Sequence, residues 1–235
     1  MTMIQQIQTE LTALADPERA KQQQRYFKTG PGEYAEGDIF RGIRMPVLRG
    51  LCKKYKHITL EEAEELLASA YHEDRLLALL LFVELYRKGK AQQKQQVYES
   101  YLRHTALINN WDLVDTSAYH IVGPHLMKRD KAPLYQLARS SLLWERRIAI
   151  IATFHFIRQR HFDDTLNLAT ILLNDPEDLI HKAVGWMLRE VGKRHLPTEE
   201  AFLRPVYKQM PRTMLRYAIE RFPKEKRLRY LKGQV

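Results

Sequence analysis

Apolar residues recur every three to four positions along almost the whole chain, which is the period of an amphipathic helix. Ile4, Ile7, Leu11 and Leu14 form the first such stripe. No segment alternates apolar and polar residues for long, so no strand is expected. The pattern predicts helices over 4–15, 16–27, 46–55, from residue 60 onward, and over 73–88, 91–104, 111–122, 132–138, 144–159, 162–173, 176–191, 199–210 and 212–222.

Several helix ends are marked by their own residues. Thr59 followed by Glu62 is a capping box, and Asp175-Pro176 is typical of an N-cap with proline at the first helical position. Gly192 is a suitable stop for the helix that begins there. The segment Thr29–Arg44 carries four glycines and a proline and has no helical stripe. It is predicted to be a loop, a small hairpin or an extended arm.

A weak internal repeat runs through the helices. Small or β-branched residues occupy Ala78, Val114, Ala149 and Val184, at spacings of 36, 35 and 35 residues, each in the apolar centre of a helix. A helix pair every 35 to 40 residues is typical of a HEAT-type α-solenoid. The predicted fold class is therefore all-α, a right-handed α-solenoid of about six HEAT-like helix pairs with a concave basic face. Without a linker-like break, residues 1–235 are expected to form a single domain.

Composition narrows the class of protein further. The 235 residues are 45% hydrophobic and 28% charged, an ordinary composition for a soluble chain. No apolar run reaches membrane-spanning length, and the N-terminus lacks a signal-peptide pattern. Cys52 is the only cysteine, and the histidines show no metal-binding spacing. We expect a cytoplasmic monomer without metal, cofactor or disulfide.

Positive charge is concentrated at one end. The net charge is +10, and the segment from Phe202 onward carries ten Lys or Arg against two Glu. This asymmetry favours an anionic partner, most plausibly nucleic acid. The alternative is a solvated basic surface without a specific partner.

The first candidate for chemistry is the stretch from Asn109 to Asp115. Asn110 is a good N-cap, and Asp112 in the first turn suits the positive end of the helix dipole. Trp111 and Asp115 are four residues apart and share a face of this helix. A carboxylate on a part-apolar face needs a partner or a function. The ordinary alternative is an ion pair with a nearby arginine.

A second candidate lies in the helix over 176–191. Trp186 shares a face with Lys182, Arg189 and Lys193, which suits stacking on a nucleotide beside phosphate contacts. The alternative is a tryptophan at the rim of the core with snorkelling cations around it. About one repeat separates Asp115 from Arg147, and Arg147 from Trp186. Trp111, Asp115, Arg147 and Trp186 are therefore expected to converge on one patch.

These residues carry a resemblance to the AlkD family of bacterial DNA alkylation-repair glycosylases, which are built from HEAT-like repeats. The matching stretches are Arg25-Tyr26-Phe27, Trp111-Asp112-Leu113-Val114-Asp115, Trp144-Glu145-Arg146-Arg147 and Lys182-Ala183-Val184-Gly185-Trp186-Met187-Leu188-Arg189-Glu190. The resemblance implies catalytic roles for Trp111, Asp115, Arg147 and Trp186. It also implies DNA contacts by Tyr26 and Arg189, and the surrounding basic surface adds the candidates Arg49, Lys182, Lys193 and Arg212.

The implied activity is hydrolysis of the N-glycosidic bond of positively charged N3- or N7-alkylated purines in double-stranded DNA, without strand cleavage and without insertion of the base into the protein. The chain departs from the family pattern in the glycine-rich loop 29–44, which is longer, and after Arg49, where a second basic residue is missing. One alternative is therefore a non-catalytic HEAT-like protein that binds damaged or branched DNA. A HEAT-type protein scaffold is a further alternative.

Overall fold

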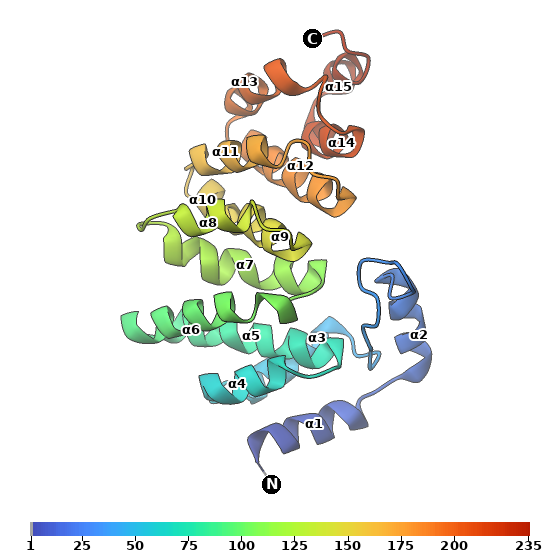
Figure 1. Cartoon of the computed structure of the whole chain (residues 1–235), viewed down its shortest axis with the longest axis vertical. Helices are drawn as coiled ribbons and strands as arrows, with labels where there is room; N and C mark the ends of the chain where they lie inside the picture. The colour runs from blue at the N-terminus through green and yellow to red at the C-terminus, as the bar shows by residue number, and fades with distance from the viewer. Residues whose placement is uncertain (1) are drawn as a thin grey trace. The chain divides into compact units, whose positions relative to one another are not determined.

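The computed structural model describes residues 2–235, and in that range the chain is helical with one isolated bridge, between Ile39 and Tyr71. The helices, drawn in Figure 1, are α1 (Met3–Ala13), α2 (Pro17–Tyr26), α3 (Met45–Lys54), α4 (Leu60–Leu67), α5 (His72–Lys88), α6 (Ala91–Arg103), η1 (Thr105–Leu107), α7 (Trp111–Leu126), α8 (Ala132–Leu137), α9 (Leu143–Ala152), α10 (Phe154–Arg158), α11 (Asp163–Ile171), α12 (Asp178–Gly192), α13 (Leu196–Val206), α14 (Arg212–Ala218), η2 (Ile219–Arg221) and α15 (Lys224–Leu231). The all-α prediction is confirmed.

The chain forms two compact units, which divide within α7 between Ser117 and Ala118. In the first unit α5 is the central helix, because it packs against α3, α4 and α6. In the second unit α12 has that place, with α9, α13 and α14 as its main neighbours. Packing between elements that follow one another closely in sequence is the arrangement of a helical solenoid. The handedness, the single domain over 1–235 and the concave basic face stay predictions.

The repeat predicted from the sequence marks the core. Ala78, Val114, Ala149 and Val184 have no exposed surface, and they lie in α5, α7, α9 and α12. Small or β-branched side chains let neighbouring helices approach closely at these positions. The weak sequence periodicity therefore reflects the positions at which the helices pack against one another.

Most predicted helix ends are correct to within two or three residues, but three details differ. Residues 144–159 form two helices, α9 and α10, which meet at Thr153, where the hydroxyl donates to the carbonyl of Ile150. The helix predicted from Pro176 begins at Asp178 with Glu177 as its N-cap. The Asp175 carboxylate accepts from Arg146 Nε at 2.6 Å and from the backbone N–H of Glu177 at 2.9 Å.

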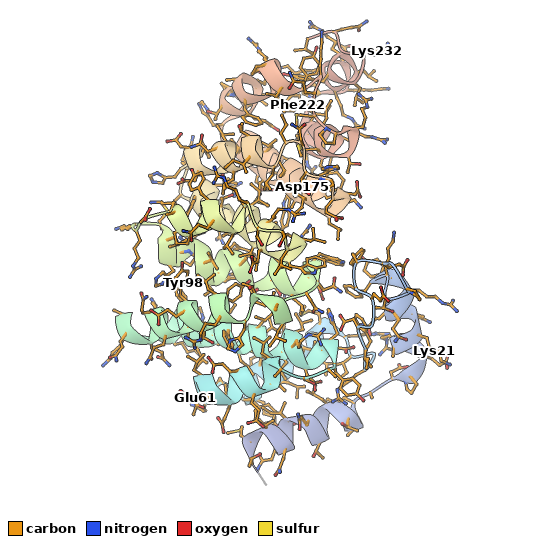
Figure 2. The ribbon with its side chains drawn as sticks, in the orientation of Figure 1. Lys21, Glu61, Tyr98, Asp175, Phe222 and Lys232 are labelled. Carbon is orange, nitrogen blue, oxygen red and sulfur yellow. The ribbon has the colours of Figure 1, made fainter. Side chains whose placement is uncertain are left out.

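Helix α15 was not expected, because its residues carry little apolar periodicity. Tyr230 provides the one buried side chain of this helix, and it meets Phe222 edge-on at 5.5 Å between ring centroids. Phe222 and Lys232, both labelled in Figure 2, lie just before and just after α15 in the chain. Within residues 2–235, no helix combines the length and the apolar character that a membrane crossing requires.

Candidate active site

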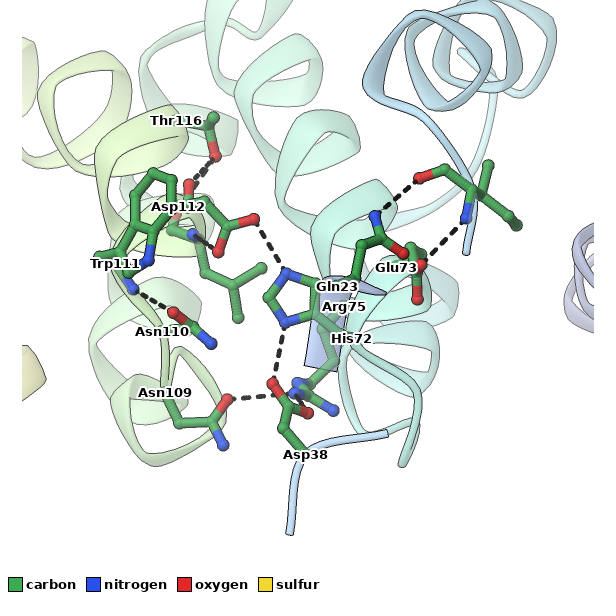
Figure 3. Close-up of polar contacts among 12 residues, drawn as sticks. Gln23, Asp38, His72, Glu73, Arg75, Asn109, Asn110, Trp111, Asp112 and Thr116 are labelled. Carbon is green, nitrogen blue, oxygen red and sulfur yellow. Dashed lines mark hydrogen bonds and ion pairs between the residues drawn. The ribbon is translucent and has the colours of Figure 1, made fainter. Parts of the chain in front are cut away.

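Helix α7 begins where the sequence predicted, at Trp111. The side-chain oxygen of buried Asn110 accepts the backbone N–H of Trp111 at 2.8 Å, and the Thr116 hydroxyl donates to the carbonyl of Asp112 at 2.7 Å (Figure 3). The start of the helix is therefore held by local hydrogen bonds. These bonds fix the backbone from which the side chains of Trp111 and Asp112 project.

Trp111 and Asp115 line one pocket of the first unit. Its volume is about 300 Å³. The other lining residues are Gln23, Phe27, Ile43, Met45, His72, Glu73, Leu76, Asp112 and Thr116. The lining combines aliphatic and aromatic carbon with three carboxyl groups, those of Glu73, Asp112 and Asp115, and with a single ionisable nitrogen base, His72. This excess of carboxylate over cation suits a positively charged guest.

The indole of Trp111 is held by two aromatic neighbours from the end of α2. Phe27 stacks on it with 5.2 Å between ring centroids and 19° between planes, and Tyr26 meets it edge-on at 6.1 Å. Phe27 is buried, whereas Tyr26 is 68% exposed. Tyr26, the predicted DNA contact, is therefore exposed to solvent and in contact with Trp111, a predicted catalytic residue.

A buried polar network lies behind the pocket. The imidazole of His72 is 1% exposed, and its Nδ1 and Nε2 each lie 2.9 Å from a carboxylate oxygen, of Asp38 and Asp112 respectively (Figure 3). Burial alone lowers the pKa of His72, but the two carboxylates, Asp112 foremost, outweigh it and raise the pKa to about 9. In turn, His72 and Arg75 hold the pKa of the Asp38 carboxyl below its usual range despite burial. The network is thus ionic at neutral pH.

The glycine-rich loop is tied to the start of α5 by the residues that follow His72. The Glu73 carboxylate accepts the backbone N–H groups of Arg41, Gly42 and Ile43 at 2.8 to 3.0 Å. The Arg41 guanidinium makes a two-pronged ion pair with buried Asp74, at 2.6 and 3.0 Å. At Gly42, φ is +82° and a Cβ would lie 2.1 Å from the carbonyl oxygen of Asp16, so only glycine fits.

Sequence reasoning missed Asp38 and His72 as site residues. A signal was present, because His72-Glu73-Asp74-Arg75 places four ionisable residues at the entry of a helix that is otherwise strongly apolar. All four are buried. Four consecutive buried ionisable groups need partners, and the polar loop 29–44 supplies at least one partner to each of them.

The model of the DNA alkylation repair enzyme family matches residues 7–222. The chain belongs to the DNA alkylation repair enzyme family. A solved structure with a similar fold is a predicted DNA alkylation repair enzyme from Enterococcus faecalis, with a TM-score of 0.68 and 18% identity over 89% of this chain and 97% of that one. A search of curated proteins gave no match.

Two of the four catalytic residues expected for an alkylation repair enzyme of this family lie in the second unit. Arg147 is buried in α9, and its Nη1 donates to the carbonyl of Leu179 at 2.6 Å. Trp186 in α12 is half-buried and packs against Phe154, with 5.9 Å between ring centroids. The convergence of Arg147 and Trp186 with the Trp111 pocket stays a prediction.

The predicted DNA-binding cations are mostly paired on the surface. In α12, Lys182 pairs with Asp178 at 2.7 Å and Arg189 pairs with Glu220. Lys193, which follows this helix, pairs with Glu190 at 2.5 Å. Exposed Arg212 donates to the carbonyl of Leu231 at 3.0 Å, and Arg49 is exposed on α3. Among residues 2–235, no cluster of three His, Cys, Asp or Glu side chains could hold a metal ion.

Proposed function

We propose that this DNA alkylation repair enzyme is a monofunctional glycosylase that releases positively charged N3- or N7-alkylated purines from double-stranded DNA. The observation that carries the proposal is the pocket that Trp111 and Asp115 line together. Its lining has more carboxylates than cations. The family match supplies DNA and alkylation damage as its context.

The reaction needs little from the protein because the lesion is already activated. When the N-glycosidic bond breaks, its electron pair neutralises the positive charge of the alkylated base, so no general acid is required. An oxocarbenium-like cation develops on the sugar, as in glycoside hydrolysis. Water then adds to C1′ and loses a proton, which leaves an abasic site. The intact strand is the expected product, since no lysine in the Trp111 pocket could form a Schiff base.

Asp115 and Trp111 are assigned to that cation. A carboxylate in a partly buried pocket stabilises a developing positive charge more strongly than it would in water. The exposed part of the indole of Trp111 favours cationic and polarised C–H groups. Arg147 and Trp186 are proposed to complete the site, with Arg147 on a phosphate or a carboxylate. Tyr26, Arg49, Lys182, Arg189, Lys193 and Arg212 are proposed to hold the DNA backbone, with the lesion recognised in the duplex rather than inserted into the protein.

The test is release of free base from a duplex that contains 7-methylguanine, at low salt. Asp115→Asn keeps the shape of the side chain and removes its charge, so we expect release to fall by about 10²-fold with DNA binding retained. Glu61→Gln, an exposed carboxylate in the first turn of α4, is the matched control and should keep the wild-type rate. Wild-type protein that binds the duplex but releases no base would instead support the non-catalytic DNA-binding alternative.

A further inference from the structure

The buried side chain of His72 links the glycine-rich loop to the candidate active site. His72 is bonded on one side to Asp38 of the loop and on the other to Asp112, the residue that follows Trp111. We propose that His72 is a positioning residue, which holds the first turn of α7 so that Trp111 and Asp115 are aligned for catalysis. This inference rests on the glycosylase activity proposed above and adds a role for the loop.

The hydrogen-bonding pattern requires a doubly protonated ring. Both neighbours of His72 are carboxylates, Asp38 and Asp112, and an ionised carboxylate can only accept. A neutral imidazole carries one N–H and can satisfy only one of them, whereas an imidazolium donates to both. Losing the ring proton would therefore break one of the two bonds and leave a buried lone pair facing a carboxylate.

The charged groups around the ring come from three elements. The loop contributes Asp38, and Arg75 of α5 donates to that carboxylate and to Asn109. From α5, Glu73 is directed at the loop backbone, and Arg41 is engaged by Asp74. From α7 come Asp112 and, across the pocket, Asp115. Gln23 of α2 is neutral and donates to the carbonyl of Ile43 at 3.5 Å. Asp38 and Asp112 thus dominate the titration of His72.

Aromatic stacking connects the same ring to Trp111 by a second route. The imidazole stacks on Phe40 with 4.3 Å between centroids and 18° between planes, and Phe40 stacks on Phe27 at 5.0 Å. Phe27 in turn stacks on Trp111. A cationic ring over an aromatic face is favourable. His72 is therefore coupled to the indole through packed rings as well as through Asp112.

Alignment matters because the reacting groups lie within one turn of the anchored residue. Asp112 is adjacent to Trp111 and three residues before Asp115, so a shift of the first turn moves both. A displacement of about 1 Å in a catalytic group can cost about 10²-fold in rate. The expected signature is a loss of the single-turnover rate with little change in DNA affinity, because His72 itself is buried and does not reach the DNA.

The sign of the pH dependence follows from the raised pKa. In the folded protein the imidazolium network is complete at neutral pH, and it is lost as the pH rises through about 9. Its contribution to stability is full below about pH 6.5, the pKa of a free imidazole. Wild-type activity should fall over this alkaline range. Asp38→Asn removes one of the carboxylates that raise the pKa of His72, so the fall should move to lower pH. In His72→Gln this fall should be absent, and the rate at neutral pH should be at most about one tenth of the wild-type rate.

The experiment measures single-turnover base release from the 7-methylguanine duplex between pH 6 and pH 10 for wild type, His72→Gln, Asp38→Asn and the control His57→Gln, an exposed histidine. The substrate's own titration is common to all four and cancels in the rate ratios. Thermal unfolding followed by circular dichroism verifies that each variant is folded. A wild-type rate in His72→Gln, or an alkaline fall that Asp38→Asn leaves in place, would overturn the proposal.

A second readout does not depend on activity. The emission of Trp111, taken as the difference between wild type and Trp111→Phe, should change with the same midpoint as the NMR titration of the His72 ring. If the wild type releases no base at any pH, the glycosylase assignment fails, yet a shared midpoint would still support the coupling of His72 to Trp111. If the Trp111 emission does not change while the His72 ring titrates, that coupling is refuted even in an active enzyme.

Discussion

The two units hold their candidate functional residues in different ways. In the first unit, buried ion pairs such as Arg41–Asp74 and His72–Asp38 fix a loop and the start of α7 behind the pocket. In the second, the cations on α12 pair with carboxylates on the surface, and the Lys182 side chain is 40% exposed. A buried pair cannot lose one partner without leaving an uncompensated charge, whereas a surface pair can exchange its carboxylate for a phosphate at little cost. We therefore expect the polar groups behind the Trp111 pocket to keep a fixed geometry and the α12 cations to be available for binding.

The largest expected effect concerns Glu73, which is in the buried network of the first unit. Glu73→Ala leaves three backbone N–H groups of the loop without their acceptor, and we expect the free energy of unfolding to fall by about 3 kcal/mol. Glu84 lies on the same helix and makes only surface pairs, with Arg87 and Lys88. Glu84→Ala should cost less than about 1 kcal/mol. Urea unfolding of both variants measures the difference, and equal losses of stability would contradict the contrast between buried and surface pairs.

A smaller effect is expected in the second unit, where close helix packing provides the rigidity. A Cβ on Gly185 would lie 2.5 Å from both the carbonyl oxygen of Met214 and Cβ of Tyr217, so Gly185→Ala should force α12 and α14 apart. We expect a loss of about 2 kcal/mol. Gly50, in α3, has open space around its Cβ position. Gly50→Ala should be neutral or stabilise by up to about 1 kcal/mol. Thermal unfolding of the two alanine variants measures both changes in stability. A Gly185→Ala variant as stable as the wild type would show that α14 can move away without cost.

The smallest effect on stability, and a clear one on binding, is expected from the surface cations. Lys182→Gln should change the free energy of unfolding by less than about 0.5 kcal/mol. If Lys182 exchanges Asp178 for a phosphate, the slope of log affinity against log salt should fall by about 1. Lys21→Gln is the matched control, because Lys21 also makes a surface pair within its own helix, with Glu18. Salt titrations of duplex binding measure both slopes, and identical slopes would remove Lys182 from the interface.

Residues whose role depends on their own neighbours in sequence were predictable. The capping box at Thr59 and the start of α7 at Trp111 follow from local hydrogen bonding, and both are as expected. The four short motifs that contain Tyr26, Trp111, Arg147 and Trp186 together identified the resemblance, and the family match confirms it. Pro176 illustrates the limit, because the helix begins two residues later, at Asp178, and the Asp175 carboxylate also binds Arg146, a partner 29 residues away.

The sequence by itself determined the helical class and placed Trp111 and Asp115 on one helix face, since both follow from spacing within a helix. The repeat followed from spacing between helices, and the catalytic roles of Trp111 and Asp115 stay predictions. Only the tertiary structure decided what lies behind them. Asp38, His72 and Asp112 are separated by 34 and 40 residues along the chain. No local pattern can pair them, because the energy that makes their charges tolerable in the interior exists only when three separate segments meet.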